Sequence, residues 1–93
     1  MSKTLTDAEI QTALTSLSGW KKSGIAIERH YEFKDFVEAI KFVNKIADAA
    51  EAAGHHPDIR IVYNQVTLQL TSHDSGGVTQ RDVKMAQKIN GVG

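Results

Sequence analysis

The sequence predicts a single α+β domain over residues 1–93, with three helices on one face of a four-stranded antiparallel sheet. Two segments alternate apolar and polar residues on either side of a turn signal, which is typical of β-hairpins. Three other segments carry apolar residues at helical spacing behind a capping residue. Hairpins form antiparallel pairs, and helices with one apolar stripe each pack together on one side of a sheet. The predicted order is therefore α-β-β-α-β-β-α.

Composition argues against several classes of function. Eleven basic and eleven acidic residues give a net charge of zero, whereas nucleic-acid-binding proteins usually show a basic excess. No apolar run approaches the length of a membrane span, and the N-terminus does not resemble a signal peptide. The absence of cysteine excludes disulfides and thiolate chemistry. We expect a cytoplasmic protein that binds neither nucleic acid directly nor a membrane.

The first helix and the first hairpin occupy the N-terminal third. Thr6 and Glu9 have the spacing of a capping box, so we expect a helix that begins there and ends before Ser18-Gly19. Residues 20–33 form the predicted hairpin, with its turn at Ser23-Gly24. Its apolar face consists of Ile25, Ile27, Tyr31 and Phe33. Arg29 interrupts this face, which suggests a bulge or a sheet edge.

A long helix should follow the cap at Asp35 and end at Gly54, because glycine commonly terminates helices. Its stripe runs from Phe36 to Ala50. Val37 and Phe42 lie off the stripe and widen the apolar surface. They are either core residues or part of a contact with another subunit, since a small domain often gains burial by oligomerising.

The second hairpin is predicted over residues 59–71, with a two-residue turn at Asn64-Gln65. The last helix begins at a second capping box, Thr79 with Asp82, and ends at Asn90-Gly91. The predicted turn would place His73 opposite His56, so the two junctions that carry histidines would meet at one end of the sheet.

Three of the four histidines occupy these junctions, and the fourth, His30, is expected to be a solvated surface residue. Histidine is the side chain whose charge changes near neutral pH, which suits proton transfer. A helix C-terminus also favours positive charge, so His55 and His56 each have a purely structural explanation. Likewise, the capping box alone explains Asp82. Three imidazoles converging beside carboxylates nevertheless predict a functional site.

Two motifs connect this site with a known family. They are Glu51-x-x-x-His55-His56-Pro57-Asp58 and Ser72-His73-Asp74-x-Gly76-Gly77-x-Thr79-x-x-Asp82. Together they resemble the pterin-4a-carbinolamine dehydratase family, and the similarity runs from about Leu5 to Ile89. Ser72 stands where threonine is common in that family and keeps a hydroxyl. Ile59 stands where an aromatic residue is common, which weakens any argument for stacking on a substrate there.

The resemblance implies a cofactor-free and metal-free lyase that removes water from a 4a-hydroxy-tetrahydropterin, giving the quinonoid dihydropterin during pterin recycling for aromatic amino acid hydroxylases. It implies that His55, His56 and His73 line the pterin site, with His55 and His73 transferring protons and His56 holding the ring. It further implies a homodimer or homotetramer. The implied substrate contacts are Glu51, Gly54, Thr71, Ser72, Asp74 and Asp82, with Asp82 or Glu51 orienting imidazoles.

Three alternatives stay open at this point. The histidines could form a zinc or iron site, although adjacent histidines lack the i, i+4 spacing that places two ligands on one helix face. The chain could be a dimerisation or coactivator module, because some members of the family are partners of a transcription factor. A third alternative is action on another pterin, such as a molybdopterin intermediate.

Overall fold

The computed structural model describes residues 3–92 and contains seven elements in the predicted order. They are α1 (Asp7–Leu14), β1 (Lys21–Ser23), β2 (Ala26–Glu32), α2 (Phe36–Ala53), β3 (Asp58–Val62), β4 (Gln65–Leu70) and α3 (Gln80–Asn90). In the part of the chain described, no helix is long and apolar enough to cross a membrane.

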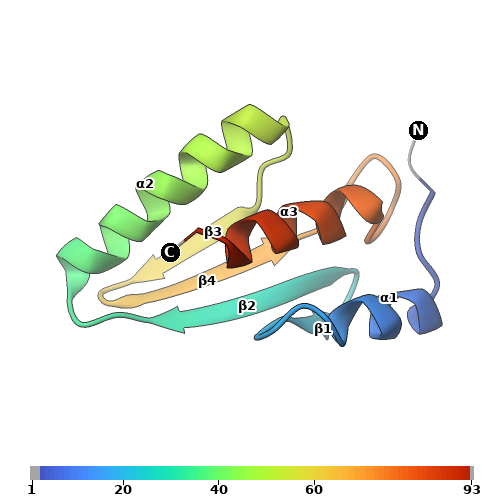
Figure 1. The fold of residues 1–93 in the computed structure, drawn as a ribbon, viewed down its shortest axis with the longest axis horizontal. Helices are drawn as coiled ribbons and strands as arrows, with labels where there is room; N and C mark the ends of the chain where they lie inside the picture. The colour runs from blue at the N-terminus through green and yellow to red at the C-terminus, as the bar shows by residue number, and fades with distance from the viewer. Residues whose placement is uncertain (1–2, 93) are drawn as a thin grey trace.

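The four strands form one antiparallel sheet in the order β1-β2-β4-β3. Figure 1 shows α2 and α3 lying across the same face of this sheet, which confirms the predicted architecture. Alternate residues of β4 explain the layering, because their side chains point to opposite faces. Val66, Leu68 and Leu70 are fully buried beneath the helices. The residues between them face the uncovered side.

The helices begin at the predicted caps. Thr6 and Glu9 form a capping box at α1, and the Asp35 carboxylate accepts a hydrogen bond from the Glu38 amide at 2.9 Å. Gly54 ends α2 with a φ of 66°, in the left-handed region that glycine adopts without strain. The first helix is shorter than predicted, since it ends at Leu14 and turns carry the chain on to Trp20.

The turn of the first hairpin differs from the prediction by one residue. Ser23 pairs with Ala26, so Gly24 and Ile25 form the turn. The side chain of Ile25 is consequently 60% exposed instead of lying on the apolar face. Arg29 does not cause a bulge, because β2 pairs without interruption with β4. Its guanidinium packs 4.3 Å from the ring centre of Tyr31.

The predicted register of the second hairpin is wrong. Its turn is Tyr63-Asn64, since Val62 pairs with Gln65. The same register, extended along the strands, places Thr71 and not His73 opposite His56. Two bonds to a distant segment hold this turn: the Asn64 amide donates to the Phe33 carbonyl at 2.8 Å, and the Phe33 N–H donates to the Asn64 carbonyl at 2.8 Å.

Candidate functional site

A buried histidine–carboxylate pair joins the end of α2 to the start of α3. His55 follows the helix-terminating Gly54, and its backbone N–H still bonds the Ala50 carbonyl at 3.2 Å. The imidazole Nε2 lies 2.5 Å from Asp82 Oδ1. The side chain of His55 is 14% exposed and that of Asp82 is fully buried. The pair is therefore largely shielded from water, where charge-assisted hydrogen bonds are strongest.

The second carboxylate oxygen of Asp82 also accepts hydrogen bonds from neighbouring groups. Asp82 Oδ2 accepts hydrogen bonds from the Thr79 N–H at 2.8 Å and from the Ser72 hydroxyl at 2.9 Å. One oxygen of Asp82 therefore belongs to the capping box, and the other is paired with His55. With Asp82 ionised and the imidazole of His55 neutral, Asp82 accepts the Nε2–H, and Nδ1 is the nitrogen with a free lone pair.

Ser72 lies inside the protein and supports this pair. Its residue is 1% exposed, and its hydroxyl contacts Asp82 and, at 2.9 Å, the hydroxyl of Thr79. The structure thus places Ser72 behind the histidine. Its burial, and not its hydrogen bond to Asp82, keeps this hydroxyl from contacting a substrate directly.

His56 forms a second pair at a similar distance but in a different environment. Its Nε2 lies 2.6 Å from Glu51 Oε2, on the last turn of α2. The two side chains are 62% and 76% exposed, so water screens their interaction. Exposed pairs of this kind contribute about 0–1 kcal/mol.

His56 and His73 line one cavity of about 450 Å³, together with Thr71. Within residues 3–92 the imidazole of His73 has no hydrogen-bond partner, and it is exposed. The Thr71 hydroxyl donates to the Ile25 carbonyl at 2.6 Å, which ties this end of β4 to the first hairpin. The cavity also contacts Asp58 and Gln69, a cross-strand pair on the sheet face that the helices leave uncovered.

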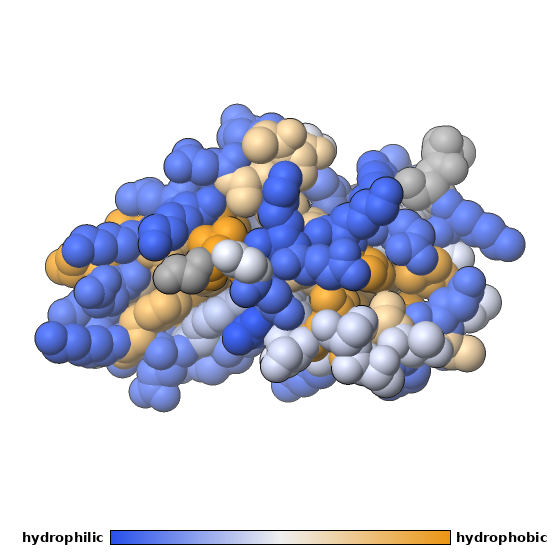
Figure 2. Space-filling view, viewed as in Figure 1, coloured by the Kyte–Doolittle hydropathy of each residue, from blue (hydrophilic) through white to orange (hydrophobic). Residues whose placement is uncertain are grey.

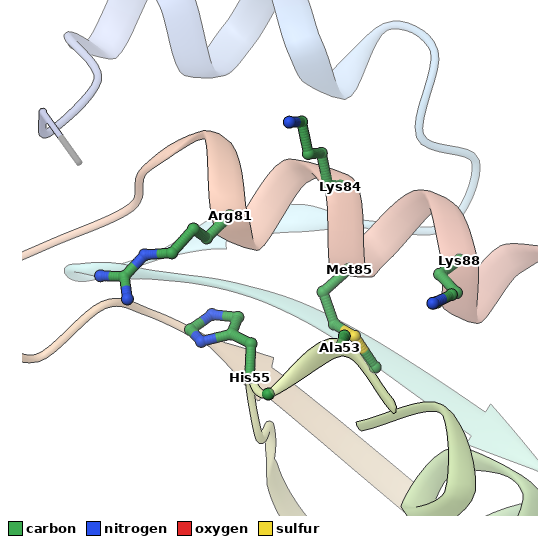
Figure 3. A pocket seen from close by; sticks show the side chains of 7 residues that line it. Ala53, His55, Arg81, Lys84, Met85 and Lys88 are labelled. Carbon is green, nitrogen blue, oxygen red and sulfur yellow. The ribbon is translucent and has the colours of Figure 1, made fainter. Parts of the chain in front are cut away.

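His55 lies on the other side of the segment 55–57. It lines a separate cavity with Gly54 and Arg81, between the end of α2 and α3, and Figure 3 shows its ring directed toward α3. The structure therefore brings His56, His73 and Thr71 together and places His55 beyond them with Asp82. Adjacent residues of an extended segment point to opposite sides, which accounts for the separation of the two neighbouring histidines.

Asp74 is held by Arg81, a residue that was not among those predicted to form the site. Arg81 Nη2 donates to Asp74 Oδ1 at 2.6 Å. This hydrogen bond is the main reason that the pKa of Asp74 is lowered from its ordinary value of 3.8. Arg81 stands inside the second motif, between Thr79 and Asp82, and that position is the only sequence signal that could have identified it.

The described residues, 3–92, contain no group of three or more histidine, aspartate or glutamate side chains placed to hold a metal ion. His55, His56 and Asp74 are instead each paired by a hydrogen bond with one side chain of opposite character.

Comparison with a solved structure and with a family profile shows which class of protein this fold belongs to. It superposes with a TM-score of 0.89 on "Crystal structure of transcriptional coactivator/pterin dehydratase from Brucella Melitensis", at 42% identity and over 95% of this chain and 96% of that one. The fold is thus that of the small α+β pterin dehydratases. Residues 3–92 also match the profile of the family described as pterin 4 alpha carbinolamine dehydratase. The chain belongs to that family.

Two relatives agree with this assignment. A protein of Koribacter versatilis (strain Ellin345), named "Putative pterin-4-alpha-carbinolamine dehydratase", is 78% identical over 92 residues, which cover 99% of this chain and 98% of that protein. A protein of Trichormus variabilis with the same name is 51% identical over 99% of both chains. A pterin dehydratase-like RuBisCO assembly factor of the alpha-carboxysome shares only the fold, with a TM-score of 0.63 and 16% identity over 78% of this chain and 84% of that one.

Proposed function

We propose that this protein removes water from a 4a-hydroxy-tetrahydropterin and releases a quinonoid dihydropterin, without a cofactor or a metal. The observation that carries the proposal is the buried His55–Asp82 pair, which is separated only by segment 55–57 from the cavity that His56 and His73 line. Family membership and the names of the relatives support it. In its physiological setting, the reaction would return pterin to aromatic amino acid hydroxylases in the cytoplasm.

The reaction needs two proton transfers. The bond between C4a and the hydroxyl oxygen breaks, and the oxygen takes up a proton to leave as water. N5 loses its proton, and its electron pair forms the new bond to C4a. A positioned base at N5 and a positioned acid at the hydroxyl each contribute typically on the order of 10²–10⁴ in rate.

The hydrogen bonds favour a division of these roles. Asp82 holds the Nε2–H of His55, so Nδ1 is free to accept the N5 proton. His73 has no competing partner among the described residues and would protonate the departing hydroxyl. His56, paired with Glu51, would hold the ring. Because the cavities of His55 and His73 open on two sides of segment 55–57, the proposal requires the pterin to lie across the end of that segment.

A direct dehydration assay on enzymatically generated 4a-hydroxy-tetrahydropterin tests the proposal. His55→Ala and His73→Ala should lower kcat by on the order of 10²–10⁴ above the spontaneous rate. His56→Ala should mainly raise KM, because a contact present throughout binding is lost. His30→Ala is the matched control and should be silent, since the imidazole of His30 bonds Thr67 on the exposed sheet face.

Three results would contradict this proposal. Equal small effects at all three positions in folded protein would contradict the acid–base assignment. An absence of any acceleration by the unsubstituted protein would contradict the function itself. Dialysis against a strong chelator should leave the rate unchanged, and a loss restored by zinc would instead favour a metal site.

We also propose that the protein is a homodimer or homotetramer. Apolar side chains stay exposed at the start of α2, where Phe36 and Val37 are 49% and 60% exposed, and at the β3–β4 turn. Figure 2 shows apolar surface at the end of the molecule where α2 begins. In the described chain β3 pairs only with β4, which leaves its outer edge open to a further strand. A light-scattering mass near 10.2 kDa at micromolar concentration would contradict this proposal.

A further inference from the structure

The cavity beside His55 has an apolar floor and a basic rim. Its volume is about 310 Å³, within the range of small-molecule sites. The floor is formed by Ala53 at the end of α2 and by Met85 on α3. Figure 3 shows Arg81 and Lys88 on either side of Met85, with Lys84 extending outward from the same helix. No acidic residue is among those that line the cavity.

The three basic side chains form one stripe. Arg81, Lys84 and Lys88 are spaced by three and four residues, which places them along one face of α3. Neither lysine forms an ion pair with any residue in the described part of the chain. This concentration of positive charge is local, because the whole chain has a net charge of zero.

Arg81 has a hydrogen-bond donor that no other group in the structure satisfies. Its Nη2 bonds Asp74, but its Nε is buried and has no hydrogen-bond partner in the structure. A buried donor without a partner costs about 1–3 kcal/mol. Because Nε itself is buried, a ligand would reach Arg81 through the exposed part of its side chain, and an anion there would also offset the charges of the two lysines.

We infer that this cavity binds the side chain of the pterin substrate and selects a side chain that carries a phosphate. The inference rests on the proposed function, because the position of His55 connects the two. N5 of a tetrahydropterin is bonded to both C4a and C6, and the side chain is attached at C6. A pterin whose N5 contacts His55 therefore directs its C6 side chain toward the cavity that His55 lines. The carbon chain would pack on Met85, and the phosphate would reach Arg81, Lys84 and Lys88.

Steady-state kinetics with a matched pair of substrates test this inference. The two 4a-hydroxy-tetrahydropterins carry the same hydroxylated C6 side chain, with and without a terminal phosphate. The phosphorylated substrate should have a KM lower by about tenfold, the effect of one or two charge-assisted hydrogen bonds. The preference should shrink in high salt, because exposed charges are screened.

The decisive variant is Lys84→Gln combined with Lys88→Gln. It should remove most of the preference for phosphate, because KM should rise more for the phosphorylated substrate than for the unphosphorylated one. Lys41→Gln with Lys45→Gln is the matched control, since these exposed lysines of α2 have the same four-residue spacing and the same charge change. Equal KM values for the two substrates in the unsubstituted protein, or equal losses on both in the variant, would overturn the inference.

A binding measurement separates this inference from the proposed function. Oxidised neopterin and its phosphate ester do not react, and their fluorescence reports binding directly. Lysine-dependent preference for the ester in a protein that dehydrates neither substrate would support the cavity assignment and refute the proposed reaction. Rapid dehydration of both substrates with no preference for the ester would support the proposed reaction and refute the cavity assignment.

Discussion

Replacing Asp82 with Asn tests the buried pair directly, because the change keeps the size of the side chain and removes its charge. The carboxylate receives three donors: His55 Nε2–H, the Ser72 hydroxyl and the Thr79 N–H. The Thr79 amide can only donate, so the amide oxygen of Asn must face it. The amide NH₂ then faces His55, whose Nε2 must become an acceptor. The expected result is a fold that persists with the proton of His55 moved to Nδ1.

The size of the effect follows from burial. Loss of hydrogen bonds to a charged group should lower the free energy of unfolding by about 1–3 kcal/mol. For a chain of this size each kcal/mol lowers Tm by about 4–8 °C. Asp82→Ala should cost more, about 3–5 kcal/mol, because it leaves buried donors without a partner. With Nδ1 protonated, His55 can no longer accept a proton from N5, so kcat should fall by on the order of 10²–10⁴.

Three measurements check this prediction: thermal unfolding, the dehydration rate, and the ¹⁵N chemical shifts of the His55 ring, which distinguish the two tautomers. Glu51→Gln is the matched control. The Glu51–His56 distance is 2.6 Å, against 2.5 Å in the buried pair, but both side chains are exposed. The free energy of unfolding of the Glu51→Gln protein should differ from that of the unsubstituted protein by less than about 1 kcal/mol. A folded Asp82→Asn protein with the normal tautomer shift, or with a kcat within threefold of normal, would refute the reasoning.

The remaining predictions concern stability and titration. Leu68→Ala should lower the free energy of unfolding by about 2–5 kcal/mol in urea titrations, because Leu68 is fully buried; a smaller loss would show that the core collapses around the vacancy. The lowered pKa of Asp74 means that its bond with Arg81 stabilises the fold above the ordinary pKa of 3.8 and is lost as pH falls through the lowered value. The stability difference between the unsubstituted protein and Asp74→Asn should therefore vanish in acid, and a constant difference would contradict this. Burial raises the pKa of Tyr31 above its ordinary value of 10.0. In Tyr63→Phe protein, Tyr31 is the remaining tyrosine. Its phenolate absorbance should therefore appear only above the pH at which an ordinary tyrosine ionises.

Local signals were enough to predict the order of elements and most of their ends. Capping boxes and a terminating glycine act over three or four residues, so Thr6, Asp35, Gly54 and Thr79 could be identified from the sequence. The alternation of β4 likewise identified its buried face. The motifs were enough to indicate the family, because they preserve the spacing of the histidines and of Asp82.

Only the tertiary structure decided how the histidines are grouped. The register of the second hairpin is held by bonds between Asn64 and Phe33, which are 31 residues apart. The partner of His55 is 27 residues away, and the basic rim of its cavity comes from a different helix. A periodic pattern contains no information about such distances, because a shift of two residues in register preserves the same buried face. The sequence by itself therefore determined which residues could form the site, and packing determined that His55 is buried against Asp82 while His56 faces water.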